Sequence, residues 1–126
     1  MSFFRRSVGR QGEDAACRFL KKNGYRIVQR NYSCGLGEID VIARNAEALV
    51  FVEVKTLTDD TVADPETHVN RAKQRQVERA AKMWLHTYGE PECAYRFDVV
   101  SVVLPPKSEP KIRHIVGAFR PTGWCR

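Results

Sequence analysis

Residues 34–55 read CGLGEIDVIARNAEALVFVEVK, and this stretch decides the fold. Two runs rich in β-branched and other apolar residues, 38–44 and 47–56, flank the dipeptide Asn45-Ala46. This pattern predicts two antiparallel strands joined by a tight turn of two residues. Acids and a lysine interrupt the apolar runs. An unpaired buried carboxylate costs several kcal/mol or takes up a proton, so these charges must be paired, hydrated or bound to a ligand.

Strand geometry predicts where these charges lie. Residues two apart in a strand project to the same side of a sheet. With a two-residue turn, Glu38 pairs with Glu53, and Asp40 and Lys55 share their face. Asp40 and Glu53 are then diagonal neighbours at roughly 7–8 Å between their backbones, a separation that one cation bridges through both side chains. A loop of three residues would reverse this arrangement.

The order of the charges indicates a chemistry. Asp40 is followed after twelve residues by Glu53, Val54 and Lys55, which is the pattern of an acid and then acid-x-lysine. The two carboxylates and the backbone carbonyl of Val54 can hold Mg²⁺ or Mn²⁺, and the lysine can position a water or neutralise developing charge. The pattern therefore predicts metal-assisted hydrolysis of a phosphodiester. On an exposed strand, a cross-strand salt bridge explains the same residues.

Helical periodicity predicts a first helix over residues 8–23 and a second helix that begins after Asn70 and ends near Tyr88. Glu13 lies at the edge of the apolar stripe of the first helix. Taken alone, this acid is explained as a first-turn residue that faces the helix dipole. The predicted apolar stripe of the second helix consists of Val77, Ala80, Ala81, Trp84, Leu85 and Tyr88.

Three further strands are predicted, at residues 25–32, 95–104 and, as a short strand, 112–116. Asp98 interrupts an apolar run, and we expect it to make a structural hydrogen bond rather than to bind a metal. The order of elements predicts an α/β (α+β) fold with an αβββαβ core and a mixed central sheet flanked by helices. We expect one domain over residues 1–126, with its core at about 8–120 and flexible basic termini.

The composition, 43% hydrophobic and 29% charged, is typical of a soluble globular protein. No apolar run approaches the roughly 20 residues that span a bilayer, and the first residues do not form a signal peptide. We therefore expect a cytoplasmic protein with no membrane partner. The four cysteines lack a metal-binding spacing and are expected to be free thiols.

The net charge of +6 is concentrated in basic segments, which suggest a nucleic acid, most often DNA, as the partner. A solubilising surface explains the same charge without a partner. The candidate phosphate contacts are Arg5, Arg6, Arg10, Arg71, Arg75, Arg79 and Lys82. An acidic patch in the loop 57–69 would repel phosphate, so we expect it to be mobile or turned away from the site. It consists of Asp59, Asp60, Asp64 and Glu66.

Five ordered motifs resemble a known family. They are Arg10-Gln11-Gly12-Glu13-Asp14-Ala15-Ala16, Arg30-Asn31-Tyr32, Gly37-Glu38-Ile39-Asp40, Phe51-Val52-Glu53-Val54-Lys55 and Arg96-Phe97-Asp98-Val99-Val100. Together they resemble the YraN-like bacterial proteins, which are similar to archaeal Holliday-junction resolvases within the PD-(D/E)xK nuclease superfamily. The resemblance covers nearly the whole chain and is far more specific than the acid-x-lysine pattern alone.

The resemblance implies a restriction-endonuclease-like fold and a nuclease that depends on Mg²⁺ or Mn²⁺, with Glu13, Asp40 and Glu53 as metal ligands and Lys55 as the catalytic lysine. Ile39 stands where the superfamily name has proline, a position that carries no ligand. Resolvase-like chemistry on two strands would suit a homodimer. Because a nuclease fold does not guarantee nuclease activity, the alternative is a nucleic-acid-binding or adaptor protein without catalysis.

Three further residues could shape the site. Glu38 could tune the metal, although pairing with a base explains it equally well. Lys73 and Gln76, at the start of the second helix, could contact a phosphate or the nucleic-acid strand. A lysine that packs its aliphatic stem and keeps its charge in water explains Lys73 equally well.

Overall fold

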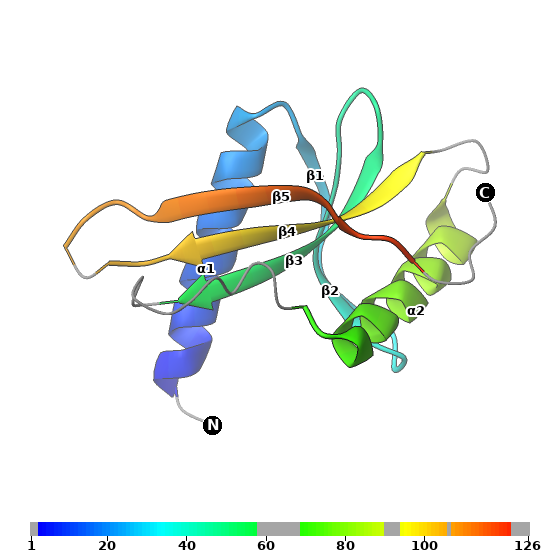
Figure 1. Ribbon diagram of the computed structural model, residues 1–126, viewed down its shortest axis with the longest axis horizontal. Coiled ribbons are helices and arrows are strands. Elements are labelled where there is room, and N and C mark those ends of the chain that lie inside the picture. The colour runs from blue at the N-terminus through cyan, green and yellow to red at the C-terminus, as the bar shows by residue number, and fades with distance from the viewer. Residues whose placement is uncertain (1–2, 58–68, 90–93, 106, 122–126) are drawn as a thin grey trace.

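The structure is a computed structural model and describes residues 3–57, 69–89, 94–105 and 107–121. Its helices and strands are α1 (Phe3–Lys22), β1 (Arg26–Ser33), β2 (Glu38–Arg44), β3 (Leu49–Leu57), α2 (Arg71–Tyr88), β4 (Tyr95–Val103) and β5 (Lys111–Phe119). This order, shown in Figure 1, confirms the predicted αβββαβ core. Two elements are longer than predicted, because α1 begins at Phe3 and β5 extends to Phe119.

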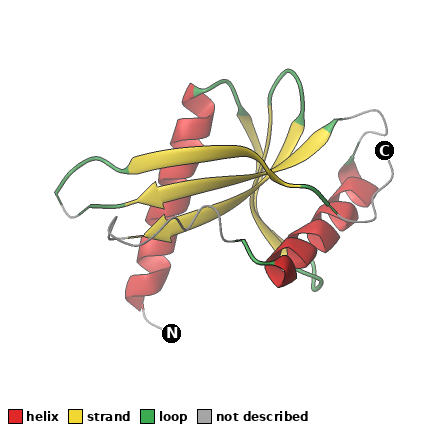
Figure 2. Ribbon diagram, viewed as in Figure 1, coloured by secondary structure: helices red, strands yellow, loops and turns green. Residues whose placement is uncertain are grey.

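The five strands form one sheet in the order β1-β2-β3-β4-β5. Neighbouring strands run antiparallel except β3 and β4, which run parallel. Two parallel neighbours require a crossover connection, and α2 lies in the segment that links them. The predicted mixed sheet flanked by helices is therefore confirmed (Figure 2).

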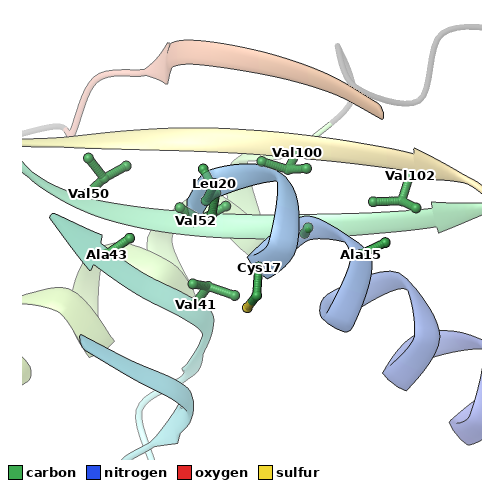
Figure 3. Close-up of a cluster of buried hydrophobic side chains, with 10 residues drawn as sticks. Ala15, Cys17, Leu20, Val41, Ala43, Val50, Val52, Val100 and Val102 are labelled. Carbon is green, nitrogen blue, oxygen red and sulfur yellow. The ribbon is translucent and has the colours of Figure 1, made fainter. Parts of the chain in front are cut away.

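The two helices pack against opposite faces of the sheet. On β3, Val50 and Val52 belong to the hydrophobic cluster that α1 covers, whereas Leu49 and Phe51 belong to the cluster that α2 covers. Such alternation is the period of a strand that is buried on both faces. Figure 3 shows the cluster under α1, where side chains of the helix point onto those of three strands. It consists of Ala15, Ala16, Cys17, Leu20, Val41, Ala43, Val50, Val52, Val100 and Val102.

A glycine lets α1 approach the end of β3 closely. A Cβ atom on Gly12 would overlap the side chain of Thr56, so only a residue without a side chain fits this position. The contact fixes the first half of the helix beside the strand that carries Glu53. It thereby sets the position of Glu13, the next residue of the helix.

The caps of α2 agree with the sequence. The side chain of Asn70 accepts a hydrogen bond of 2.8 Å from the backbone N–H of Lys73, and Gly89 follows the last helical residue. The predicted stripe is buried at Val77, Ala80, Ala81 and Trp84. Tyr88 was wrongly placed in this stripe. It is 60% exposed because it lies at the last position of the helix, beyond the part that the sheet covers.

The predicted two-residue turn between β2 and β3 is wrong. Arg44 pairs with Leu49, so four residues, 45–48, form the connection. The side chain of Asn45 accepts hydrogen bonds of 2.9 Å from the backbone N–H groups of Glu47 and Ala48. This local bonding, typical of asparagine in turns, includes both residues in the turn.

The longer turn moves every cross-strand partner by two positions. The ladder ends at Val41 and Val52, before Asp40 and Glu53, so the predicted pairing of Glu38 with Glu53 does not form.

Strict alternation also fails near the start of β2. Ile39 and Ile42 belong to the cluster under α2, while Val41 and Ala43 belong to the cluster under α1. Residues three apart share a face only if the strand departs from its regular pleat between them. Asp40 lies at this departure, so strand parity alone does not determine where its carboxylate points.

Candidate metal centre

Asp40 and Glu53 lie where the ladder between β2 and β3 ends. The final backbone pair of this ladder is Val41 with Val52. Beyond it, the backbone N–H of Val54 donates a hydrogen bond of 2.8 Å to Oδ2 of Asp40. A side chain of β2 thus satisfies this N–H in place of its backbone. The bond holds the Asp40 carboxylate against β3, beside Glu53.

Glu53 is buried, with 8% of its surface exposed. Its Oε2 atom lies 3.9 Å from Nζ of Lys73. Within the described part of the chain, its Oε1 atom is buried and has no hydrogen-bond partner. Buried polar side-chain atoms have a partner in the large majority of cases, so this oxygen is suited to bind a ligand.

The environment disfavours negative charge on both acids. Burial is the largest cause that raises the pKa of Glu53, and the charge of Asp40 and a hydrogen bond with Asp40 act in the same direction. Against the opposing charges of Lys73 and Lys55, these causes together raise the pKa of Glu53 to about 7. Burial also raises the pKa of Asp40, although the N–H of Val54 opposes this rise. Two carboxylates in a water-poor site cannot both be charged cheaply, and they therefore retain protons or take up a cation.

Two lysines supply positive charge at the site. Lys73 comes from the first turn of α2, which Asn70 caps. Lys55 follows Glu53 by two residues on β3 and is half-buried. The charges of both lysines lower the pKa of Glu53. They are single charges on long side chains, and they do not bring the pKa of Glu53 back to its ordinary value.

Glu13 of α1 acts on the candidate metal centre only through its charge. That charge raises the pKa of Asp40. The carboxylate itself lies 3.6 Å from the guanidinium of Arg30, which also binds Asp14 at 2.9 Å. Arg30 was not predicted as a site residue. Its position in the Arg30-Asn31-Tyr32 motif was the only signal in the sequence.

Two carboxylates are enough for the predicted metal, and no third carboxylate joins them among the described residues. Mg²⁺ is commonly bound by one or two carboxylates and several waters. Asp40 and Glu53 fit this requirement, because the Oε1 atom of Glu53 is buried and has no hydrogen-bond partner among the described residues. Over residues 3–57, 69–89, 94–105 and 107–121, no group of three or more Asp, Glu, His or Cys side chains is arranged to hold a metal ion. In this arrangement Glu13 pairs with Arg30 rather than completing the site.

The predicted site-shaping residues lie at one rim. Glu38, Lys73 and Gln76 line an open cavity of about 400 Å³. Gly37 lies in the same cavity, and a Cβ atom there would overlap the backbone carbonyl of Gln76, so the turn before β2 packs tightly on α2. The charge of Glu38 also raises the pKa of Asp40. Glu38 and Gln76 are exposed.

The predicted phosphate contacts on α2 are exposed and follow helical spacing. Positions three or four apart lie along one side of a helix. The side that carries the predicted phosphate contacts faces away from the buried Trp84. They are Arg71, Arg75, Arg79 and Lys82. Arg10 is exposed on α1 and lines an open cavity of about 600 Å³ with Glu13 and Arg30. The acidic patch Asp59, Asp60, Asp64 and Glu66 and the side chains of Arg5 and Arg6 lie outside the described residues.

Asp98 makes the structural hydrogen bonds that the sequence predicts. It accepts from Nε of Arg96 at 3.0 Å and from the backbone N–H of Gly117 at 2.9 Å, and it lies 2.7 Å from Nε2 of His114. Burial acts to raise the pKa of Asp98, but these hydrogen bonds outweigh it and hold the pKa below its ordinary value. Asp98 therefore belongs to the scaffold.

Known proteins are similar to this chain in sequence. The sequence model of the Uncharacterised protein family UPF0102 matches residues 12–102, which include Glu13, Asp40 and Glu53. The chain belongs to the UPF0102 family. This result confirms the resemblance to the YraN-like proteins. A UPF0102 protein of Geobacter metallireducens is 40% identical over 119 residues, which cover 94% of this chain and 97% of that protein. Another, of Desulfosudis oleivorans, is 48% identical over 98 residues, which cover 78% of this chain and 80% of that protein.

The region that matches the UPF0102 family contains α1 from Gly12 onward, β1 to β3, α2 and nearly all of β4. It therefore includes every element that contributes to the candidate metal centre. Neither helix of the UPF0102 chain is long and apolar enough to cross a membrane, over the residues that the structure describes.

Proposed function

We propose that this UPF0102 protein is a nuclease that hydrolyses phosphodiester bonds of DNA with the help of Mg²⁺ or Mn²⁺. The observation that carries the proposal is the buried Oε1 atom of Glu53, which has no hydrogen-bond partner among the described residues and lies beside the half-buried carboxylate of Asp40. Protein interiors rarely retain such an atom unless a ligand uses it. A hard divalent cation is the ligand that two carboxylates favour.

Each residue of the site then has a role. Asp40 and Glu53 hold the cation, and the Val54 N–H fixes the orientation of the Asp40 carboxylate. Bound to these two carboxylates, such a cation would polarise the phosphate and acidify a water. Lys55 and Lys73 offset the negative charge that develops on the phosphate, since both already act on the charge of Glu53.

A DNA-nicking assay tests this proposal. Wild-type protein is incubated with supercoiled plasmid and with four-way-junction DNA, with Mg²⁺ or Mn²⁺ and with EDTA. We expect cleavage that needs the metal and that falls about 100-fold or more in Asp40→Asn and in Lys55→Ala. The matched controls Glu47→Gln and Lys107→Ala change the same charges at exposed positions and should cleave as wild type does. Equal activity in all five proteins would show that a contaminant cuts the DNA.

A second function is favoured by the ion pair of Glu13. Because Arg30 holds this acid and no third carboxylate joins the pair among the described residues, a protein that binds nucleic acid without cleaving it fits the same geometry. Calorimetry with Mn²⁺ separates the two functions. Metal uptake that is lost in Asp40→Asn supports the nuclease, and DNA binding without metal uptake supports the binding protein.

A further inference from the structure

A further cavity lies at the far end of α2 from the candidate metal centre. It has a volume of about 320 Å³, and Trp84, Tyr88, Gln29, Arg26 and Arg44 contribute to its walls. Trp84 follows Lys73 by eleven residues, so the cavity lies roughly 16 Å along the helix from the metal centre. None of the five residues belongs to the metal centre.

Aromatic rings form one wall of this cavity. The rings of Trp84 and Tyr88 lie 5.3 Å apart between centroids and are tilted by 45°. Trp84 is fixed in place, because its ring packs edge-on against Phe51 and its Nε1–H donates a hydrogen bond of 3.0 Å to Oε1 of Gln29. Tyr88 is 60% exposed. The cavity therefore presents the exposed ring of Tyr88 next to the ring of Trp84, which is held in place.

Two arginines give another part of the cavity wall a positive charge. Arg26 and Arg44 are direct cross-strand partners at the end of the ladder between β1 and β2. Both line the cavity, and no acid is among its described lining residues. The C-terminal end of α2 lies there too, but its fractional negative charge is smaller than that of two guanidiniums.

We propose that this cavity binds a nucleotide. Its base stacks on Tyr88, its phosphate binds Arg26 and Arg44, and the amide of Gln29, oriented by Trp84, faces the edge of the base. A volume of about 320 Å³ lies at the small end of the range for ligand sites, which matches one nucleotide rather than a longer segment. The nucleotide is either free or an unpaired residue of a nucleic acid. The proposal does not depend on the metal centre or on cleavage.

Fluorescence of Trp84 tests the proposal directly. The chain has two tryptophans, and Trp124 lies outside the described residues. Trp124→Phe therefore leaves Trp84 as the single tryptophan of the full chain. This protein is titrated with adenosine monophosphate and, separately, with a short oligodeoxyadenylate, in EDTA so that metal binding and cleavage play no part. We expect saturable quenching, because the ligand enters beside the Trp84 ring.

Substitutions in the same background locate the ligand. We expect Tyr88→Ala to weaken binding about fivefold or more, and Tyr88→Phe to restore it, since base stacking needs the ring and not the hydroxyl. Arg26→Ala should weaken binding about tenfold through loss of a charged hydrogen bond. Arg18→Ala, which removes an exposed arginine of α1, should bind as the parent does.

The outcomes separate the sources of the nucleotide. Quenching by both ligands or by the free nucleotide supports a site for free nucleotides, and quenching by the oligonucleotide alone supports an unpaired residue of a nucleic acid. Quenching by neither ligand would overturn the proposal. Equal weakening by Arg26→Ala and Arg18→Ala, with no effect of Tyr88→Ala, would also overturn it, because attraction by net charge would then explain the binding.

Discussion

Glu53 on β3 and Asp98 on β4 are buried acids that occupy neighbouring positions of one parallel ladder, which pairs Glu53 with Val99 and Val52 with Asp98. Since their positions differ by one, the two side chains point to opposite faces of the sheet. Asp98 receives hydrogen bonds from two side chains and a backbone N–H, and its pKa lies below the ordinary value. Glu53 keeps an oxygen without a partner among the described residues, and its pKa rises to about 7.

The difference between these acids lies in their partners, not in their burial. Both are at most 8% exposed. A buried carboxylate that has all its donors stays charged and strengthens the fold, whereas one that lacks donors destabilises the fold unless a proton or a cation joins it. Asp98 is therefore a structural residue, whereas Glu53 lacks the partners that would make it one and fits the proposed cation site.

The largest effect is expected from Asp98→Ala. Removal of this fully buried carboxylate leaves the half-buried guanidinium of Arg96 and the N–H of Gly117 without their acceptor. We expect the free energy of unfolding to fall by about 3 kcal/mol or more, the range for breaking a buried ion pair. Urea denaturation measures it, with Glu47→Ala as the exposed control that should change stability by less than about 0.5 kcal/mol. A loss as small as that of the control would remove the contrast between the two acids.

The opposite sign is expected from Glu53→Gln in EDTA. The folded-state pKa of Glu53, about 7, lies above its ordinary value of 4.5, so the folded protein binds a proton more tightly than the unfolded chain does. The stability of the wild type therefore falls as the pH rises from about 4.5 through about 7. Glutamine carries no charge, and we expect the variant to be more stable than the wild type at pH 8 by about 2 kcal/mol.

Urea denaturation at pH 5 and pH 8 checks this second prediction. The advantage of Glu53→Gln should shrink at pH 5, where Glu53 of the wild type is itself protonated. Asp14→Asn provides a matched control, because its carboxylate is half-exposed and binds Arg30. A variant that is less stable than the wild type at both pH values would show that Glu53 is a satisfied structural acid after all.

The sequence was enough to predict features that depend on neighbours in the chain. The strands β2 and β3, the cap Asn70 and the end of α2 at Gly89 follow from local patterns that the structure confirms. Asp98 was also interpreted correctly, since an acid inside an apolar strand needs partners. The partners themselves were not predictable, because His114 and Gly117 lie 16 and 19 residues away on β5.

The geometry around Asp40 was harder to predict. The two extra turn residues come from hydrogen bonds of the Asn45 side chain, and dipeptide turn rules do not contain this information. The break in alternation between Ile39 and Ile42 comes from packing against α2, a contact that is distant in sequence. The ion pair between Glu13 and Arg30 joins α1 to β1 and has no local signature.

The smallest effect is expected from Lys73→Ala. The ammonium lies 3.9 Å from Glu53, and the lysine side chain is one-third exposed, so its loss should change stability by less than about 0.5 kcal/mol. The charge of Lys73 nevertheless lowers the pKa of Glu53, and we expect this pKa to rise further in the variant. Carbon-detected NMR of the Glu53 carboxyl measures it, with Lys107→Ala as the exposed control. An unchanged pKa would mean that Lys73 does not act on Glu53, and Lys55 would then be the lysine that offsets the charge at the candidate metal centre.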